Sequence, residues 1–270
     1  MNVYIFLLCY NESVLLPHTI QHYRNYIPNC IITIYDNMST DNSALIAKSL
    51  GCNVIYFESN NRLNDGKQSN IKNTCWNNIK NGWIICADMD EWLCITHDEL
   101  YHEYLNDTTV LTIKGVNMVG YSKSLSLEDI NLHLLNKGAD YLLESKKLCF
   151  FVPSIKSVKY CMGVHNARFK GHIKYSNKIY INKHMEFLGL NYYLNKKKNR
   201  NKRTLIKNAD SLKISIYNFA LKYIWHSYSS DINKHKNNYL ITCKRSKKIN
   251  IDNDEKIIKS FIELLIQLIL

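Results

Sequence analysis

Short apolar runs alternate with helical patterns along the first hundred residues. Four runs contain few polar residues, which is typical of strands buried on both faces of a parallel sheet. These runs are residues 3–10, 31–35, 54–57 and 83–87. Helical periodicity covers residues 15–26, 43–50 and 66–81, and Asp65 with Gln68 three positions later resembles a capping box before the last of these. The pattern predicts a β-α-β-α-β-α-β order.

Polar residues follow directly after each apolar run. They are Asn11 and Glu12 after the first, Asp36 and Asn37 after the second, Glu58 and Ser59 after the third, and Asp88 and Asp90 after the fourth. Doubly wound sheets bind their ligands beyond the carboxyl ends of the strands. We therefore expect these side chains to meet in one acidic, amide-rich crevice.

The pattern is less regular after Trp92. It predicts helices at residues 97–105 and 188–198, strands at 110–113 and 178–181, and a helical tail from about Ser211. No linker rich in Gly, Ser or Pro divides the chain. We therefore expect one domain over residues 1–210, in which 1–95 bind the ligand and 96–210 cover it, followed by a helical extension over 211–270.

Composition and charge restrict the class of protein. The chain has 35 Lys and Arg against 23 Asp and Glu, and this surplus of +12 attracts phosphorylated or polyanionic ligands. Nine scattered cysteines without a Cys-x-x-Cys pair are typical of buried thiols in a reducing compartment. The N-terminus lacks the features of a signal peptide, and the apolar residues 257–270 are too few to span a membrane. We expect a cytoplasmic protein, whose C-terminal helix offers a contact for a membrane or a partner.

The most specific feature is the strand end Asp88-Met89-Asp90-Glu91-Trp92. Carboxylates this close repel one another unless one faces a ligand and another a divalent cation. Mg²⁺ and Mn²⁺ take oxygen ligands and share them with phosphate groups. The segment therefore predicts a site for a metal and a diphosphate, with an ordinary acidic loop as the alternative.

Three motifs together resemble the family 2 type nucleotide-sugar glycosyltransferases. They are Cys9-Tyr10-Asn11-Glu12, Asp36-Asn37-Met38-Ser39-Thr40-Asp41 and Asp88-Met89-Asp90-Glu91-Trp92. Their order and spacing are more specific than any one of them. The resemblance implies a GT-A-like α/β fold with a Rossmann-like, mostly parallel sheet flanked by helices, and transfer of a sugar from a nucleotide sugar to a hydroxyl acceptor on a glycan, lipid or protein.

The resemblance also implies roles for residues that bind the donor. The loop with Tyr10, Asn11 and Glu12 would line the nucleoside, and Asp36 would accept the N3–H of a uracil, which favours a UDP-linked donor. Lys67 and Gln68, at a helix start, would bind phosphate oxygens. The alternatives are a base other than uracil, favoured by Asn37 or a shifted loop, a structural role for Asp36 beside a helix cap, and a solvated helix start for Lys67 and Gln68.

A metal site and a catalytic base are implied as well. Asp88 would bind ribose or sugar hydroxyls beside the metal, Asp90 would ligate Mn²⁺ or Mg²⁺, and His165 and His184 would add contacts to the metal or diphosphate. The segments around these two histidines are similar to a subgroup of the family that has a His-containing turn and a later His-Tyr motif. The match at His184 is loose, because Met185 stands in place of the tyrosine. Structural roles for both histidines are the alternative. Inversion at the sugar requires a carboxylate base, for which Glu91 and Asp129 are candidates.

Residues 196–203 contain six cations in eight positions. Such a run usually forms a solvated face; the functional interpretations are neutralisation of a diphosphate, attachment to an anionic membrane and binding of an anionic acceptor. The sequence leaves two alternative functions. An Asp-based phosphohydrolase or phosphotransferase would also place Asp-x-Asp after a strand, and a nucleic-acid-binding module would explain the charge, although no nucleic-acid motif is present and none is expected as a partner.

Overall fold

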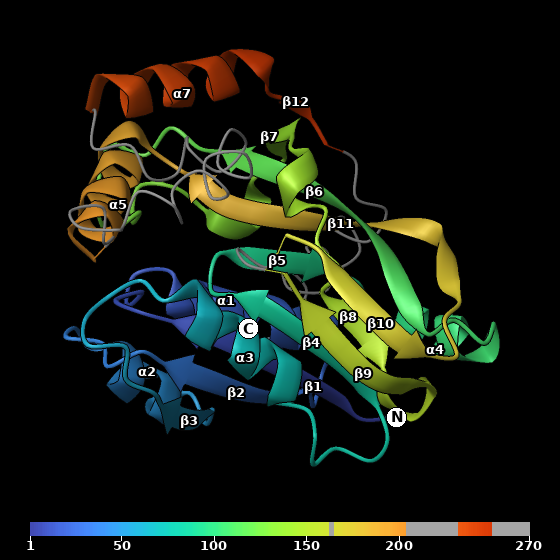
Figure 1. Ribbon diagram of the computed structural model, residues 1–270. Coiled ribbons are helices and arrows are strands. Elements are labelled where there is room, and N and C mark those ends of the chain that lie inside the picture. Colours follow the sequence, from blue (N-terminus) through green and yellow to red (C-terminus); the bar gives the residue numbers. More distant parts are fainter. Residues whose placement is uncertain (162–164, 204–231, 250–270) are drawn as a thin grey trace, which may run out of the picture.

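The computed structural model describes residues 1–161, 165–203 and 232–249. Its first half is built on four parallel strands in the order β4-β1-β2-β3, and each strand lies within one residue of its predicted position (Figure 1). These strands are β1 (Val3–Cys9), β2 (Ile31–Asp36), β3 (Asn53–Tyr56) and β4 (Trp83–Asp88). The parallel order brings the carboxyl ends of all four strands to one edge.

The helices between these strands are α1 (Leu16–Tyr26), α2 (Ser43–Ser49) and α3 (Asp65–Thr74). The first two match the predicted segments, but α3 ends seven residues before the predicted end at residue 81. Trp76, just beyond that end, is 7% exposed and packs in the apolar core instead of continuing the helix. The N-cap of α3 is Asn64, whose side chain accepts from the amide of Lys67, so the cap lies one residue before the predicted Asp65.

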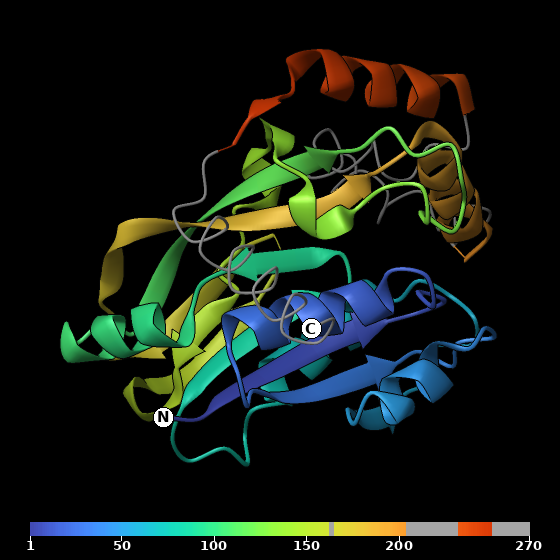
Figure 2. The same cartoon turned by 180° about the vertical axis from the view of Figure 1, so that it is seen from behind.

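Successive side chains of β1 point to opposite faces of the sheet, and each face has its own core. Ile5 and Leu7 pack with Ile20 of α1 in the larger core, whereas Phe6 packs with Trp76 in the other. Figure 2 shows α1 in front of the first face, and Figure 1 shows α3 with the ribbon of β9 (Ile155–Tyr160) and β10 (Ala167–Gly171) in front of the second. The central strands are thus buried on both sides, as their apolar runs predict.

The second half extends the same sheet. The predicted helix at residues 97–105 is α4 (His97–Leu105), which begins with a capping box between Thr96 and Glu99. The two predicted strands are longer than expected: β6 (Val110–Val119) and β11 (Tyr175–Phe187) pair in parallel, and β5 (Glu91–Cys94) pairs antiparallel with β11. Short antiparallel strands that the sequence did not predict complete the sheet. They are β7 (Lys137–Asp140), β8 (Cys149–Phe151) and β12 (Lys247–Lys248).

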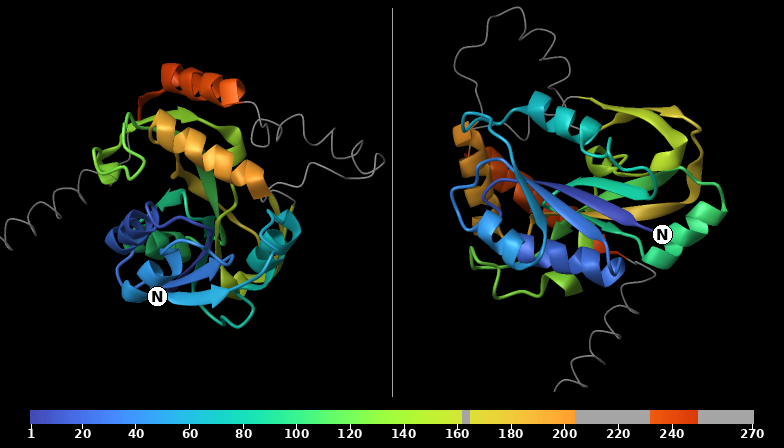
Figure 3. Two further views of the ribbon diagram at one scale, coloured as in Figure 1. Left: turned by 90° about the vertical axis from the view of Figure 1, so that its left-hand side faces the viewer. Right: turned by 90° about the horizontal axis from the view of Figure 1, so that it is seen from below.

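Two helices lie together above this half of the sheet (Figure 3). They are α5 (Leu190–Arg203), predicted at residues 188–198, and α7 (Ile232–Arg245). Tyr193 of α5 stacks on Phe187 at the end of β11, with ring centroids 4.7 Å apart, and Tyr239 of α7 packs with both. The predicted helices within residues 211–231 and 257–270 lie outside the described residues.

The described residues confirm the predicted fold class, an α/β fold in which helices flank a mostly parallel central sheet. Its second half is less regular, as expected, because three 3₁₀ helices interrupt the short strands. They are Leu132–Leu134, Leu142–Glu144 and Val152–Ser154. No helix within the described ranges is both long enough and apolar enough to cross a bilayer.

Candidate active site

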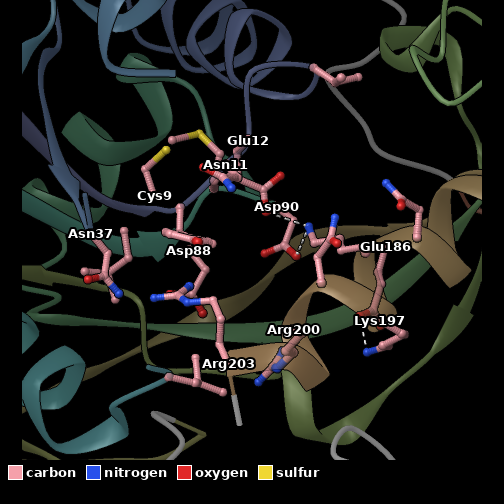
Figure 4. Close-up of a pocket in the computed structure, with 18 of the residues that line it drawn as sticks. Cys9, Asn11, Glu12, Asn37, Asp88, Asp90, Glu186, Lys197, Arg200 and Arg203 are labelled. Carbon is pink, nitrogen blue, oxygen red and sulfur yellow. Dashed lines mark hydrogen bonds and ion pairs between the residues drawn. The ribbon is translucent and has the colours of Figure 1, made fainter. Parts of the chain in front are cut away.

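A cavity of about 250 Å³ opens beyond the carboxyl ends of β1, β2 and β4, and α5 forms a wall of it (Figure 4). Six predicted site residues line it from the first half of the chain: Tyr10, Asn11, Glu12, Gln68, Asp88 and Asp90. Four cations line it from α5: Lys196, Lys197, Arg200 and Arg203. One wall is therefore rich in carboxylates and amides, and the other is basic.

The loop after β1 is fixed to the loop after β2. Asn11 has a positive φ of 53° and accepts from the amide of Thr40 at 2.7 Å, while its own amide donates to Ser39 Oγ at 2.9 Å. Asparagine tolerates this left-handed conformation better than most residues. The two loops therefore hold the ends of β1 and β2 in one rigid edge of the cavity.

Asp36 does not face the cavity. Its side chain is fully buried, and its Oδ1 accepts from the amide of Ser39 at 2.7 Å. The next residue, Asn37, lines the cavity instead, and with its amide oriented to satisfy both neighbours it accepts from Arg203 Nη2 at 2.6 Å and donates to the carbonyl of Phe57 at 3.3 Å. The structure therefore places Asn37, and not Asp36, at the wall of the cavity, and Asp36 shapes the turn.

Asp88 joins a buried cluster of charges. Its Oδ1 lies 2.8 Å from Nζ of Lys72 on α3, and its Oδ2 lies 3.4 Å from Nζ of Lys146. Both lysine side chains are at most 5% exposed. Burial would raise the pKa of Asp88, but the two ammonium groups outweigh it, so this pKa lies below its ordinary value.

Glu91 belongs to the same cluster and does not line the cavity. Its side chain is fully buried, with Oε1 2.5 Å from Nζ of Lys146 and Oε2 accepting from the amide of Asp88 at 2.7 Å. Burial raises the pKa of Glu91 to about 7. A base must reach the proton that it removes, whereas Glu91 does not line the cavity and its carboxylate accepts from the backbone of the strand end.

Glu144 completes the cluster from the second half of the chain, 3.1 Å from Nζ of Lys146. Its backbone packs directly on Gly115 of β6, where an added Cβ would lie 2.2 Å from the carbonyl carbon of Glu144. Only glycine allows this approach. The close packing of β6 on residue 144 thus places the carboxylate of Glu144 within ion-pair distance of the buried Lys146.

Asp90 points to α5. Its Oδ2 lies 2.8 Å from Nζ of Lys196, and the same ammonium lies 2.9 Å from Oε1 of Glu12. Burial would raise the pKa of Asp90, but Lys196 and His184 hold it well below its ordinary value. The predicted metal ligand is therefore already paired with a cation of the protein.

His184 lies on the other side of Asp90, with Nε2 3.6 Å from Oδ2. Its Nδ1 lies 2.7 Å from Oδ1 of Asn117, an acceptor, so Nδ1 carries a proton. Burial would lower the pKa of His184, but the carboxylates of Glu144 and Asp90 raise it to about 9. A histidine protonated on both nitrogens cannot ligate a metal.

These contacts test the expected Mn²⁺ or Mg²⁺ site. Two cationic side chains face Asp90, Asp88 pairs with two lysines, and the described part of the chain contains no group of three acidic, His or Cys residues arranged to hold a metal. The donor set as folded does not fit a divalent ion. The chemistry that the site offers is binding of an anionic, oxygen-rich ligand between carboxylates and cations.

Three other predicted residues lie away from the cavity. Lys67 donates to the carbonyl of Glu58, and His165, half-buried, has Nδ1 3.0 Å from the carbonyl of Leu143. Asp129 hydrogen-bonds the hydroxyl of Ser122 and accepts from the amide of Lys123 at 2.8 Å, so it shapes a surface loop. None of the three reaches the cavity with its side chain; Gly163 and Val164, beside His165, lie outside the described residues.

The residues that the sequence did not assign to the site are mostly lysines. Lys72 and Lys146 are isolated along the chain and carry no motif, so their place in the cluster follows only from the fold. The cations of residues 196–203 were noticed, but the usual solvated-face interpretation is wrong for Lys196, Lys197, Arg200 and Arg203, which line the cavity. Their helical spacing on α5 was the available signal.

The chain is similar to a known protein family. The model of a family described as Glycosyl transferase family 2 matches residues 4–152, which is more than half of the chain. The match contains the three motifs at the strand ends and, apart from Val3, the four parallel strands β1 to β4. None of the curated proteins matches this chain.

Solved structures with a similar fold were also found. One is residues 1–349 of S. aureus TarS in complex with UDP, with 12% identity, a TM-score of 0.42, and coverage of 79% of this chain and 68% of that chain. The same protein in complex with UDP-GlcNAc has 13% identity, a TM-score of 0.42, and coverage of 87% and 72%. The mannosyltransferase PcManGT from Pyrobaculum calidifontis, in complex with GDP-Man and Mn²⁺, has 9% identity, a TM-score of 0.40, and coverage of 75% and 61%.

Proposed function

Because this chain belongs to glycosyl transferase family 2, we propose that it moves a sugar from a UDP-linked donor to a hydroxyl group of an acceptor, with inversion at the anomeric carbon. The enzyme is a glycosyltransferase that uses a nucleotide sugar. Membership of this family favours the glycosyltransferase over a phosphohydrolase or a nucleic-acid-binding module. Neither of those alternatives explains the paired loops after β1 and β2. The uracil base of the donor, the inversion at the anomeric carbon and the identity of the catalytic groups are proposed in addition to the family's activity.

The single observation that carries the proposal is the cavity between the strand ends and α5. Tyr10 and Asn37 line it together with Arg203, which stacks on the Tyr10 ring, whereas Asp90 lines it together with Lys196, which pairs with that carboxylate. A nucleoside diphosphate has the same polarity, with a flat polar base at one end and anionic phosphates at the other. We place the base near Asn37 and the diphosphate near Lys196 and Arg200.

The preference for uracil is carried over from the resemblance of the three strand-end motifs to family 2 enzymes. The amide of Asn37 lies at the proposed base end, but its oxygen accepts from Arg203 Nη2 at 2.6 Å and its nitrogen donates to the carbonyl of Phe57 at 3.3 Å, so a base bound there would compete with these contacts. Direct competition between UDP, CDP and GDP for the free protein, followed by calorimetry, tests this part, and tighter binding of GDP or CDP would contradict it.

The base required for inversion is assigned to Glu186. The cavity-lining carboxylates in the described part of the chain are Glu12, Asp88, Asp90 and Glu186, and Glu186 is the one that comes from the second half, where the acceptor would enter. Burial would raise the pKa of Glu186, but its pairing with Lys197 holds that pKa below its ordinary value. The carboxylate is therefore ionised at neutral pH, as a proton acceptor must be.

The proposed function is tested by incubating the full chain with UDP-glucose, UDP-galactose and UDP-N-acetylglucosamine, both with Mn²⁺ and with a chelator. We expect slow release of UDP, because water replaces a missing acceptor, and loss of this release in Asp90→Asn. The matched control is Asp98→Asn, at an exposed position on α4. Release of phosphate from phosphomonoesters without release of UDP from any donor would contradict the proposal.

A further inference from the structure

A lysine of the protein itself lies beside Asp90 at the acidic strand end. Nζ of Lys196 lies 2.8 Å from Oδ2 of Asp90 and 2.9 Å from Oε1 of Glu12, so one ammonium bridges two carboxylates from different loops. Its side chain is 21% exposed and lines the cavity. Figure 4 shows Glu12 and Asp90 on one side of the cavity and helix α5 on the other.

The position of this ammonium is fixed by the packing of α5. Tyr193 stacks on Phe187 of β11, and the buried pair of Lys197 and Glu186 lies one residue away from Lys196. Lys197 is 4% exposed, so the register of the helix against β11 cannot shift without breaking this pair. Lys196 is consequently held toward the cavity by its neighbours and not only by its own ion pairs.

The same face of the helix presents further cations. Arg200 and Arg203 follow Lys196 at intervals of four and three residues, which places the three on one side of α5, and all three line the cavity. An ammonium has three N–H donors. Glu12 and Asp90 take two of those of Lys196, which leaves one for an oxygen of a bound phosphate.

A divalent ion bound to Asp90 would occupy nearly the same position as the ammonium of Lys196. The ion would lie about 2.0–2.2 Å from its oxygen ligands, whereas Nζ of Lys196 already lies less than 3 Å from Oδ2 of Asp90 and Oε1 of Glu12. Two cations so close repel strongly in a partly buried site. The ligand oxygens that the metal needs are thus the ones that the lysine uses.

We propose that Lys196 takes the part of the divalent cation in this enzyme, so that it binds the diphosphate of the donor and transfers the sugar without a metal. The proposal rests on the proposed function, because it concerns the leaving group of that reaction. It replaces the Mn²⁺ or Mg²⁺ expected from the sequence. Arg200 lies one helical turn further along the same row of cations and binds the diphosphate with it.

The step balances as follows. The bond between the anomeric carbon and the oxygen of the β-phosphate breaks, and both of its electrons stay on that oxygen. The acceptor oxygen forms the new bond to the anomeric carbon, and its proton passes to the carboxylate of Glu186. The ammonium of Lys196 keeps its protons throughout and stabilises the charge that develops on the departing diphosphate.

Two measurements on the full chain test the proposal. Titration of the free protein with Mn²⁺, followed by electron paramagnetic resonance, should leave the signal of aqueous Mn²⁺ unchanged. Calorimetry should give the same affinity for UDP in Mn²⁺ and in excess chelator, within about twofold. Lys196→Met should weaken UDP binding in chelator by at least about tenfold, while Lys196→Arg, which keeps the charge, should lose less than half as much in free energy.

Lys198→Met is the matched control, because Lys198 is on the same helix but exposed. It should bind UDP like the wild type. Stoichiometric Mn²⁺ binding that Asp90→Asn abolishes, or UDP binding that chelator weakens more than tenfold, would overturn the proposal. Absence of UDP binding in both conditions would overturn the proposed function instead, and the Mn²⁺ titration of the free protein would still decide which cation occupies the site.

Discussion

The guanidinium of Arg203 lies over the ring of Tyr10, with Cζ 3.3 Å from the ring centroid. The same residue is tied to the loop after β3, since the amide of Leu63 donates to its carbonyl at 3.0 Å and its Nη2 donates to the carbonyl of Arg62 at 3.3 Å. The last turn of α5 is therefore attached to the half of the chain that carries the parallel strands. This contact closes the end of the cavity assigned to the base.

Replacing Arg203 by alanine should weaken binding of UDP by roughly 5–30-fold, because a partly desolvated cation–π contact is worth about 1–2 kcal/mol and tenfold in affinity corresponds to about 1.4 kcal/mol. Calorimetry measures the change. Lys202→Ala serves as the control, because Lys202 is exposed on the same turn of α5 and does not line the cavity. Equal affinities for the two variants would mean that the stack does not contribute to the nucleotide site.

We expect replacement of Asp36 to affect the stability of the fold and replacement of Asn37 to affect the choice of nucleotide. Asp36→Ala should lower the free energy of unfolding by about 1–3 kcal/mol, since the partly buried amide of Ser39 loses its acceptor. Asn37→Ala should change the relative affinities for UDP, CDP and GDP with a smaller effect on stability. Urea denaturation and calorimetry on both variants separate the two roles. A changed base preference in Asp36→Ala alone would restore the original assignment of the base contact.

Asp88→Asn should cost more stability than an equivalent change at the surface. Its loss leaves Lys72, whose side chain is 2% exposed, without a full negative charge, and we expect the free energy of unfolding to fall by about 1–3 kcal/mol. Asp140→Asn is the control, because Asp140 and Lys114 form an exposed pair that should contribute less than about 1 kcal/mol. Chemical denaturation at neutral pH measures both, and equal losses would show that the cluster at Asp88 is not structural.

The first half of the fold could be predicted from the sequence because its signals are local. Each parallel strand is a continuous apolar run, and the residues after it are polar, so the edge where Asn11 and Asp88 meet follows from the topology of such sheets. Antiparallel pairs of three or four residues, such as β8 with β4, carry no comparable pattern. Their place depends on contacts between distant segments.

The acidic residues of the candidate site were expected together from the sequence, whereas the cations of residues 196–203 had neutralisation of a diphosphate as only one of several interpretations. A motif such as Asp88-Met89-Asp90 is visible in the sequence, but its electrostatic partners are not, since Lys72, Lys146 and Lys196 come from three separate elements. The direction of a side chain at a strand end also cannot be read from spacing alone. Asp36, the last residue of β2, is buried away from the cavity, whereas Asn37, the next residue, lines it.

Glu99 gives a prediction about pH. It is the N3 residue of the capping box of α4, and its Oε1 lies 2.8 Å from Nζ of Lys178 on β11. Burial would raise its pKa, but the hydrogen bonds from Lys178 and from the amide of Thr96 outweigh this, so the pKa of Glu99 lies below the ordinary 4.5. The folded state therefore favours the ionised form, and this contribution to stability is present above pH 4.5 and is lost as the pH falls through the lower, folded pKa.

Glu99→Gln removes this contribution while it keeps a side chain that can still accept from the amide of Thr96. At pH 7 the variant should be less stable by a few tenths to about 1 kcal/mol, because the pair with Lys178 is partly exposed. Below pH 4.5 the difference between the variant and the wild type should shrink, since the wild-type carboxyl becomes protonated. Urea denaturation of both proteins from pH 3 to pH 7 measures the difference between their free energies of unfolding. The other carboxyl groups contribute equally to both proteins and cancel in this difference. Lys178→Met should show the same loss of stability at pH 7. A difference that stays constant over this range would assign the effect to the cap of α4 and not to the charge.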